Sequence, residues 1–399
     1  MQGMTPLPND APRMVLGVTC AQTCLILTAR LRAFREAGFR VTVVSAPGEL
    51  LDRTAAAAGV EAVAIPMHRG IALGADFLSL CRIIGLLWHI RPDLVEFSTP
   101  KAGLLGMLAA WICRVPHRIY LLRGLRLEAS SGTKRRILMA AEQLAAACAQ
   151  VVVCNSESLR CEALVWRLAA PSKLRVLGGG SSNGVDTEIF FPWISPVRGQ
   201  LGIPEDALVI GFVGRLTRDK GIPELAEAFE RILESEPRAF LLLVGWFDAS
   251  EDALPDALRH SLEHHERIRV TGLVAETAPY YRAMDVFVLP SWREGFPNAV
   301  LEAAATELPV VTTESTGARD SVVPEVTGLL IPPGYPEAIA ESVLMLLADA
   351  DRRRQMGQAA RAWVLKHYLC REVLGRTVAF YQALGCREKD PEKEGVTVA

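Results

Sequence analysis

Short apolar stretches rich in Val and Ile alternate with longer stretches rich in Ala and Leu along most of the chain. The apolar stretches are continuous and do not alternate with polar residues, which is typical of strands buried on both faces of a parallel sheet. In the first half, the pattern predicts strands at 15–19, 40–45, 60–65, 93–97, 118–122, 150–154 and 173–177. It predicts helices at 22–37, 76–90, 100–113, 133–148 and 157–167.

The same alternation starts again in the second half. Strands are predicted at 208–213, 240–244, 268–271, 286–289, 310–313 and 328–331, and helices at 222–235, 253–265, 277–284, 297–306 and 336–347. Between the halves, a passage rich in Gly, Ser and Pro runs from Gly178 to Pro204 and is typical of a linker. The sequence therefore predicts an α/β fold with two Rossmann-like domains that face each other across a cleft.

The linker gives the domain limits. The N-terminal domain is predicted to span residues 1–190 and the C-terminal domain residues 191–365. A helical stretch from 351 to about 384 adds no strand, and its last part, 366–385, is predicted to pack back toward the N-terminal domain. Residues 386–399 are rich in charge and are predicted to be disordered.

Charge and cysteine content narrow the possible functions. Lys and Arg number 43 and Asp and Glu 45, so no overall field attracts nucleic acid, and we expect no such partner. The nine cysteines include no CxxC pair, which disfavours a disulfide framework or a zinc site and fits a reducing, cytoplasmic location. The N-terminus has no basic start followed by an apolar stretch, so no signal peptide is predicted.

Two apolar stretches raise the question of a membrane. Residues 77–90 are interrupted by Arg82, and residues 102–113 are shorter than the roughly 20 residues that a spanning helix needs. We expect both to be core helices first and peripheral membrane surfaces second. Residues 133–139 combine cations with apolar side chains, which would give weak adsorption to anionic lipid, although a solvated helix start explains them equally well.

Ligands of open parallel sheets bind at the carboxyl ends of the strands. The strand predicted at 208–213 is followed by Gly214-Arg215-Leu216-Thr217-Arg218-Asp219-Lys220-Gly221, which leads into a helix. Gly214 lets a ligand approach the backbone. Arg215 and Lys220 can clamp a diphosphate, because Arg offers a planar fork and Lys a point charge. A tight turn with two solvated cations is the alternative interpretation.

A second cluster follows the strand predicted at 286–289. It contains Glu294-Gly295-Phe296-Pro297-Asn298, and Glu302 lies inside the helix that is expected to begin at Pro297. The amides of Gly295, Phe296 and Asn298 would be free at the helix N-terminus. A carboxylate accepts hydrogen bonds from vicinal hydroxyls, so one Glu can hold a ribose and the other a sugar. For an isolated pair, complementing the helix dipole is the simpler interpretation.

Taken together, the two clusters resemble glycosyltransferase family 4, the large retaining family with the GT-B fold. Its E-x7-E element corresponds to Glu294 and Glu302, and its G-R-x4-K-G element to Gly214 through Gly221. The resemblance extends over nearly the whole chain, through Asn183-Gly184-Val185-Asp186, Gly245, Thr271-Gly272-Leu273 and Ser315-Thr316-Gly317-Ala318-Arg319-Asp320.

The resemblance implies a donor site for a nucleotide sugar, with UDP expected from family frequency. Arg215 and Lys220 would bind the diphosphate, Glu302 the ribose and Glu294 the transferred sugar. Gly272 and Leu273 would meet the nucleobase, mainly through their backbone. The remaining implied donor contacts are Gly214 and, at the phosphate or sugar, the segment of Gly295, Phe296, Pro297 and Asn298. Glu294, Arg215 and Lys220 are the implied catalytic residues. The resemblance further implies that the leaving diphosphate takes the proton of the acceptor, in which case no protein nucleophile is required.

The N-terminal half departs from the wider family pattern. Thr19-Cys20-Ala21-Gln22-Thr23 stands where many relatives have a Gly-rich loop, and Arg123-Gly124 stands where relatives often have His-Gly. Arg123 stays protonated and cannot act as a base. It is expected either to contribute charge at the site or to form a surface ion pair.

Family members that build bacterial capsule, O-antigen or exopolysaccharide are similar in residues 98–103, 179–186 and 293–298. Those enzymes typically extend a sugar linked to polyprenyl diphosphate. The similarity implies such an acceptor and a place in the cytoplasm at the inner-membrane surface. The anionic acceptor would meet four cations, Arg69, Lys101, Arg123 and Arg126.

No metal or other cofactor is expected. Asp349-Ala350-Asp351 resembles a metal-binding DxD but lies between two predicted helices, and the histidines show no metal-ligand spacing. Two other functions remain open: a nucleotide-sugar epimerase on the same scaffold, and a non-catalytic protein that binds nucleotides or carbohydrates. A dehydrogenase is disfavoured because no G-x-G-x-x-G follows the first strand.

Overall fold

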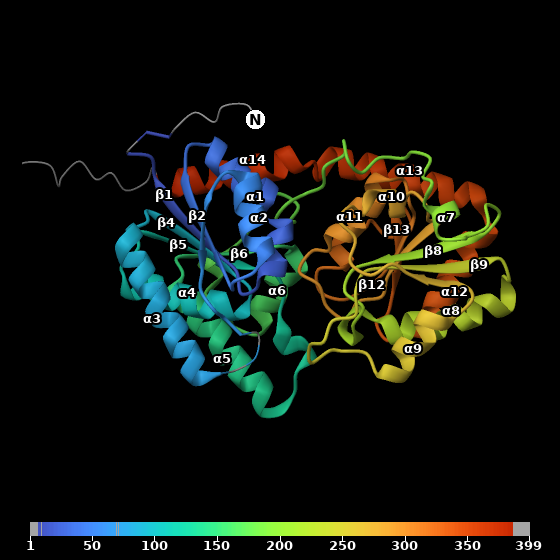
Figure 1. Cartoon of the computed structure of the whole chain (residues 1–399), viewed down its shortest axis with the longest axis horizontal. Helices are drawn as coiled ribbons and strands as arrows, with labels where there is room; N and C mark the ends of the chain where they lie inside the picture. The colour runs from blue at the N-terminus through green and yellow to red at the C-terminus, as the bar shows by residue number, and fades with distance from the viewer. Residues whose placement is uncertain (1–6, 9, 69, 71, 386–399) are drawn as a thin grey trace, which may run out of the picture.

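The computed structural model describes residues 7, 8, 10–68, 70 and 72–385, so the predicted tail at 386–399 lies outside the described residues. The chain forms two lobes that lie side by side (Figure 1). One lobe has a seven-stranded sheet in the order β3-β2-β1-β4-β5-β6-β7, and the other a six-stranded sheet in the order β10-β9-β8-β11-β12-β13. All strand pairs are parallel. The predicted fold of two Rossmann-like α/β sheets is confirmed.

The N-terminal lobe places helices between successive strands. Its elements are β1 (Arg13–Gly17), η1 (Ala21–Ile26), α1 (Thr28–Glu36), β2 (Arg40–Ser45), α2 (Glu49–Ala58), β3 (Glu61–Ala64), α3 (Leu73–Ile90), β4 (Leu94–Ser98), α4 (Pro100–Ile112), β5 (His117–Leu122), η2 (Arg126–Ala129), α5 (Gly132–Cys148), β6 (Val151–Cys154), α6 (Glu157–Val165), η3 (Pro171–Lys173) and β7 (Leu174–Val176).

The C-terminal lobe repeats this arrangement. Its elements are α7 (Val197–Gln200), β8 (Leu208–Val213), η4 (Arg218–Lys220), α8 (Ile222–Ser235), β9 (Ala239–Val244), α9 (Asp256–His264), β10 (Ile268–Val270), α10 (Ala278–Tyr281), β11 (Val286–Leu289), α11 (Asn298–Ala305), β12 (Val310–Thr313), η5 (Arg319–Ser321), β13 (Gly328–Ile331) and α12 (Pro336–Ala348). They are followed by α13 (Ala350–His367) and α14 (Cys370–Gly385).

Several predicted helices differ from the observed ones. The helix predicted at 22–37 is divided into η1 and α1, and α2 was not predicted. The helix predicted at 253–265 begins only at Asp256, directly after Pro255, because proline lacks the amide that a helix interior needs. The helix predicted at 277–284 is a single turn, α10.

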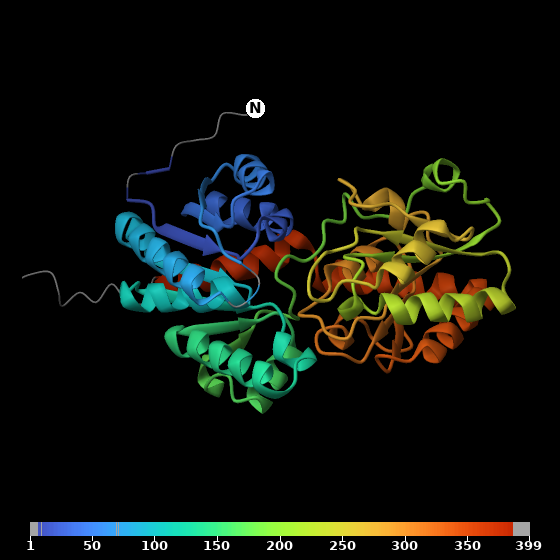
Figure 2. The same cartoon turned by 60° about the horizontal axis from the view of Figure 1, so that its bottom comes forward.

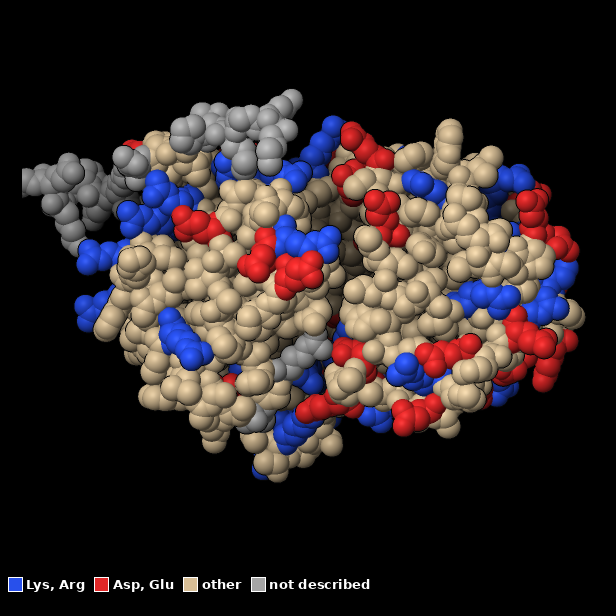
Figure 3. All heavy atoms as spheres, viewed as in Figure 1, with Lys and Arg blue, Asp and Glu red and all other residues tan. Residues whose placement is uncertain are grey.

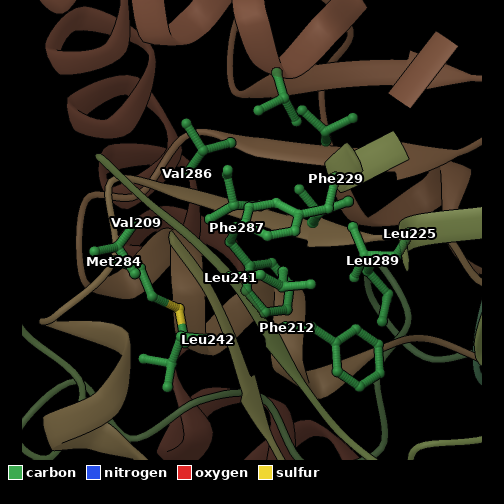
Figure 4. Close-up of a cluster of buried hydrophobic side chains, with 14 of the residues drawn as sticks. Val209, Phe212, Leu225, Phe229, Leu241, Leu242, Met284, Val286, Phe287 and Leu289 are labelled. Atoms are coloured by element: carbon green, nitrogen blue, oxygen red, sulfur yellow. The ribbon is translucent and has the colours of Figure 1, made fainter. Parts of the chain in front are cut away.

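The C-terminal lobe has a continuous apolar core on both faces of its sheet (Figure 4). Phe212 and Phe287 from neighbouring strands and Phe229 from α8 are all fully buried. Packing of this density holds the strand ends in fixed positions, so the loops that follow β8 and β11 start from a rigid base.

Helix α14 leaves the C-terminal lobe and lies along the N-terminal lobe (Figure 1). Its Tyr381 stacks on Phe34 of α1 with ring centroids 5.1 Å apart. The Tyr381 hydroxyl donates to Oε2 of Glu96 on β4 over 2.5 Å. The last helix of the chain therefore contributes to the core of the first lobe.

Arg30 and Glu96 form a fully buried ion pair at this contact. Nε of Arg30 donates to Oε1 of Glu96 over 3.2 Å, and its Nη1 donates to the carbonyl oxygen of Ser182 over 2.9 Å. The pair thus ties α1, β4 and the linker together with Tyr381. Because both charges are far from water, each depends on the other for its stability.

Helices α3 and α4 were both predicted to be core helices first and peripheral membrane surfaces second. Helix α4 is largely buried in the core, whereas α3 is buried along one side and exposed along the rest. On α4, Ala102, Met107 and Ala110 are fully buried. On α3, the buried residues are confined to a stripe of Ser79, Ile83 and Leu87. By length and composition, α3 is also the one described helix that could cross a membrane, with a mean hydropathy of 1.4.

The buried ion pair gives a test of the fold. Glu96→Ala leaves the Arg30 guanidinium buried without its counter-charge, so we expect the free energy of unfolding to fall by about 3 to 5 kcal/mol. Urea unfolding measures this change as an earlier midpoint. Glu36→Ala, at an exposed carboxylate of α1, is the matched control and should shift it by less than about 0.5 kcal/mol. Equal midpoints for the two variants would contradict a stabilising role for the pair.

Candidate functional site

A cavity of about 290 Å³ lies between the lobes, and the surface is hollowed there (Figure 3). It opens at the carboxyl ends of strands from both sheets, where ligands of such folds bind. Five cationic side chains from the two lobes contribute to its wall. The lining residues are Thr19, Cys20, Thr23, Thr99, Pro100, Lys101, Tyr120, Arg123, Gly124, Arg126, Arg215, Ser250, Asp252 and Arg293.

Arg215 enters this cavity from the loop that follows β8. Its Nη1 donates to Oδ2 of Asp248 over 2.8 Å, in the loop that follows β9. The two loops approach so closely that a Cβ added to Gly245 would lie 1.7 Å from the carbonyl oxygen of Gly214. Glycine at 245 is therefore needed to bring Asp248 to Arg215.

Asp219 links the two sequence clusters. It is buried, accepts a 2.6 Å hydrogen bond from Thr217 and a 2.9 Å one from Nη2 of Arg293, and lies 3.7 Å from Arg215. Burial alone would raise the pKa of Asp219, but the Thr217 hydrogen bond and the charges of Lys220, Arg293 and Arg215 outweigh it and lower the pKa. Asp219 therefore stays ionised and orients both guanidinium groups.

Lys220 pairs directly with Glu294. Nζ of Lys220 lies 2.5 Å from Oε1 of Glu294, and Ser291 donates to the same oxygen over 2.8 Å. The Glu294 amide is fixed by a 2.9 Å hydrogen bond to the carbonyl oxygen of Thr316. The side chains of both charged residues are mostly buried, at 18% and 12% exposure. This pair joins the two sequence clusters through their proposed catalytic residues.

The lobes meet in backbone contact beside this pair. A Cβ added to Gly295 would lie 1.9 Å from the carbonyl oxygen of Arg123, and one added to Gly124 would lie 3.5 Å from the Gly295 nitrogen. Only glycine at 295 permits this approach. Glu294 is thereby held next to Arg123 of the opposite lobe.

Helix α11 begins one residue later than predicted, at Asn298, with Pro297 directly before it. In the described part of the chain, the amides of Gly295, Phe296 and Asn298 make no backbone hydrogen bond. The Phe296 ring packs against Tyr368 with centroids 5.2 Å apart. Phe296 can therefore offer a ligand its amide, while its side chain holds the loop in place.

Glu302 is separate from the other three charged residues that were predicted to bind the donor. On α11, its Oε2 accepts a 2.8 Å hydrogen bond from the Tyr281 hydroxyl, and burial raises its pKa to about 6. No contact within the described residues joins Glu302 to Arg215, Lys220 or Glu294. Likewise, neither Gly272 nor the exposed Leu273 lines the interdomain cavity.

The structure places three of the four predicted acceptor residues at the cavity, and Arg69 lies outside the described residues. The Lys101 ammonium pairs with Asp76, and Arg126 lies 3.3 Å from Glu251 of the opposite lobe. Arg123 donates to Ser98 over 3.1 Å and to Ser182 over 3.0 Å.

Arg123 is not the surface ion pair that was one of its two expected roles. Burial and the nearby Arg30 charge lower its pKa to about 10. It remains a cation at neutral pH. Among the described residues, its Nη2 has no hydrogen-bond partner, so the guanidinium keeps a free donor beside the cavity.

Four charged residues of the site were not predicted: Asp219, Asp248, Asp252 and Arg293. Asp219 lies within the first sequence cluster and Arg293 directly precedes Glu294 of the second. Their positions in the sequence could therefore have indicated a role in the site. Asp248 follows Gly245 at the end of β9, and only its place at a strand end could have indicated a role.

In the described ranges, no group of three His, Cys, Asp or Glu side chains could hold a metal ion. Asp349 of the DxD-like sequence caps α13, because its side chain accepts from the Arg352 amide. The charged groups of the site instead form a chain of alternating sign suited to an anionic ligand with hydroxyl groups.

Comparison with known families gives two matches that together cover most of the chain. Residues 195–363 match the family described as glycosyl transferases group 1. Residues 27–180 match the family described as glycosyl transferase 4-like domain.

Two relatives and one solved structure agree with this assignment. The chain is 36% identical over 345 residues to the capsular polysaccharide biosynthesis glycosyltransferase CapM of Staphylococcus aureus, covering 86% of this chain and 90% of that one. It is 31% identical over 286 residues to the Escherichia coli enzyme UDP-Gal:alpha-D-GlcNAc-diphosphoundecaprenol alpha-1,3-galactosyltransferase, covering 68% of this chain and 71% of that one.

The structure of HepE from Anabaena in complex with UDP and glucose superimposes with a TM-score of 0.79 at 21% identity, covering 93% of this chain and all of that one. A likeness at this identity establishes the fold, and the sequence matches establish the family. The chain belongs to glycosyltransferase family 4 and has the GT-B fold.

Proposed function

We propose that the protein is a retaining glycosyltransferase of bacterial surface polysaccharide synthesis. It moves a hexose or N-acetylhexosamine from a UDP-sugar to a glycan linked to polyprenyl diphosphate, in the cytoplasm at the inner-membrane surface. The observation that carries the proposal is the 2.5 Å contact between Lys220 and Glu294. This contact brings the G-R-x4-K-G and E-x7-E elements together beside the interdomain cavity.

Donor binding exchanges the partners of the two cations. Arg215 and Lys220 leave Asp248 and Glu294 and bind the diphosphate oxygens of the donor. Glu294 is then free to accept hydroxyls of the transferred sugar, while Asp219 keeps Arg215 and Arg293 oriented. The partial burial of these groups supports this exchange, because charge-assisted hydrogen bonds are stronger out of bulk water.

Transfer then follows on one face of the sugar. The bond between the anomeric carbon and the β-phosphate oxygen breaks, and the acceptor oxygen bonds to the same face of that carbon. The acceptor proton moves to the departing phosphate oxygen, so the configuration is retained without a protein nucleophile. Arg215 and Lys220 stabilise the negative charge that grows on the diphosphate.

An anionic acceptor fits the N-terminal side of the cavity. Lys101, Arg123 and Arg126 contribute to its wall there, and Arg123 has an unpaired Nη2. The E. coli relative is named for an acceptor joined to diphosphoundecaprenol, and the S. aureus relative for capsular polysaccharide. The first name supports a lipid-linked acceptor for this chain, and the second supports a place in surface polysaccharide synthesis.

Lys220→Ala tests the proposal in an assay of UDP release from a panel of nucleotide sugars, with and without short-chain polyprenyl-diphosphate sugars. We expect kcat to fall by about a hundredfold or more. The KM for the donor should rise by a smaller factor, because charge on the diphosphate is greatest in the transition state. The wild-type product should keep the anomeric configuration of the donor, which NMR measures.

Lys366→Ala, at an exposed lysine of α13, is the control and should keep the wild-type kcat. An unchanged kcat in Lys220→Ala would remove the proposed role of the lysine. A wild-type protein that binds the donor without releasing UDP would instead be a non-catalytic binding protein. Conversion of the free nucleotide sugar to its epimer would identify an epimerase.

The pH dependence of donor binding tests Glu302. Because its pKa is raised to about 6, the carboxylate form dominates above that pH and the acid form below it. A carboxylate accepts both ribose hydroxyls, so donor affinity should fall as the pH drops through about 6. Isothermal calorimetry with an intact nucleotide sugar, whose diphosphate diester does not titrate in this range, measures the effect.

Glu302→Gln should bind the donor more weakly at neutral pH and lose most of this pH dependence. Glu341→Gln, at an exposed glutamate of α12, should keep it. A pH profile that is the same in Glu302→Gln and in the wild type would show that another group is responsible.

A further inference from the structure

Helices α3, α4 and α5 lie side by side on one face of the N-terminal sheet (Figures 1 and 2). Helix α3 packs on the core through Ser79, Ile83 and Leu87, yet its solvent-exposed side is apolar as well. Leu73 is 81% exposed and Phe77 and Trp88 are each 64% exposed. Their spacings of four and eleven residues place them on one stripe of the helix. An exposed apolar stripe of this length indicates an interaction surface.

The apolar surface continues onto the neighbouring helix. Trp111 and Ile112 at the end of α4 are 57% and 41% exposed. Because α3 and α4 both connect parallel strands, they run in the same direction. Trp88 and Trp111, each near the end of its helix, therefore lie at the same end of the layer. Two tryptophans with an apolar ring system and a polar N–H suit the boundary between water and lipid.

The acidic residues of this layer are paired or buried, so its exposed unpaired charges are positive. The three helices contain two acidic residues, Asp76 and Glu142. Asp76 pairs with Lys101, and Glu142 is buried against the Tyr120 hydroxyl at 2.6 Å. Arg82 and Arg136 are exposed and make no ion pair within the described part of the chain. The outer surface over α3 is accordingly mostly uncharged, interrupted mainly by cations (Figure 3).

The same surface reaches the interdomain cavity. Asp76, in the first turn of α3, pairs with Lys101, which lines the cavity. The next residues, Phe77 and Leu78, are 64% and 58% exposed. The apolar stripe therefore starts at the rim of the cavity and runs away from it along α3.

We propose that this surface, hereafter the α3 face, docks on a bilayer that contains anionic phospholipids. It consists of Leu73, Phe77, Leu78, Arg82, Trp88, Trp111, Ile112 and Arg136. The apolar side chains enter the headgroup region, and the two arginines contact lipid phosphates. The inference rests on the proposed function, because docking would serve a lipid-linked acceptor. Such an acceptor has its diphosphate at the bilayer surface, and docking would bring the rim of the cavity to that level.

A bilayer fits the α3 face better than a second copy of the chain does. Two copies would bring like charges together, which opposes association. For the segment 133–139 the sequence left lipid contact and a solvated helix start both open, and of its charged residues Arg136 is the one that belongs to this face. Lys134 pairs with Glu251 over 2.7 Å, and the Arg135 guanidinium lies over the Trp166 ring at 5.6 Å.

Co-sedimentation with vesicles of phosphatidylethanolamine and phosphatidylglycerol tests the proposal. Phe77→Ser/Trp88→Ser should lower the partition coefficient by at least about tenfold, because two large apolar side chains no longer enter the bilayer. The matched control is Trp193→Ser/Ile194→Ser, in the linker, where the wild-type side chains are 71% and 91% exposed. It should bind like the wild type.

A second pair of variants tests the charges. Arg82→Glu/Arg136→Glu should bind the same vesicles at least about tenfold more weakly. Arg354→Glu/Arg371→Glu changes the net charge equally on exposed residues of α13 and α14 and should lose much less. Vesicles of phosphatidylcholine alone should bind all these proteins weakly.

The proposal would be overturned if the wild type did not bind the anionic vesicles, or if the α3 and linker variants lost vesicle binding equally. It would also be overturned if the wild type bound no lipid and formed a dimer that Phe77→Ser/Trp88→Ser dissociates. UDP release in solution with a short-chain acceptor separates this result from the proposed activity. Phe77→Ser/Trp88→Ser should keep the wild-type rate. A wild type that binds vesicles but releases no UDP would refute the proposed activity and would still support docking of the α3 face on the bilayer.

Discussion

Arg215 and Lys220 lie partly buried at the boundary between the two lobes, where a cation without a counter-charge is costly. Each is held by a carboxylate from a different loop, Asp248 after β9 and Glu294 after β11. The two ion pairs therefore fix three loops of the C-terminal lobe relative to one another. In the proposed function, the same need for opposite charge is met by a diphosphate, whose oxygens satisfy both cations at once.

The contact between the lobes adds the second constraint. Gly295 has no room for a side chain because the Arg123 carbonyl occupies that space. The loop that follows β11 and carries Glu294 is thus in close contact with the lobe that carries the proposed acceptor site. Tyr381 of α14 joins the buried pair of Arg30 and Glu96, and this pair is linked to Arg123 because Arg30 and Arg123 both donate to Ser182. The proposed chemistry needs a cavity that is held between the lobes in this way.

Much of the fold could be predicted from sequence, because strands buried on both faces have a continuous apolar pattern. β11 and β12 were predicted to the residue. The division of the first helix and the exposed side of α3 could not be predicted, since an apolar helix has the same sequence pattern whether its outer side meets protein, lipid or water. In the site, the pair of Lys220 and Glu294 follows from two motifs, whereas Asp248 becomes relevant only once the fold brings its loop to Arg215.

In the proposed function, one nucleotide sugar is held jointly by Arg215, Lys220, Glu294 and Glu302. A crystal structure of the protein with a UDP-sugar tests it most directly. We expect diphosphate oxygens within hydrogen-bond distance of Arg215 and Lys220, with Asp248 and Glu294 released from them, and the ribose hydroxyls on Glu302. A nucleotide bound away from these four side chains, or ion pairs that persist beside a bound donor, would contradict it.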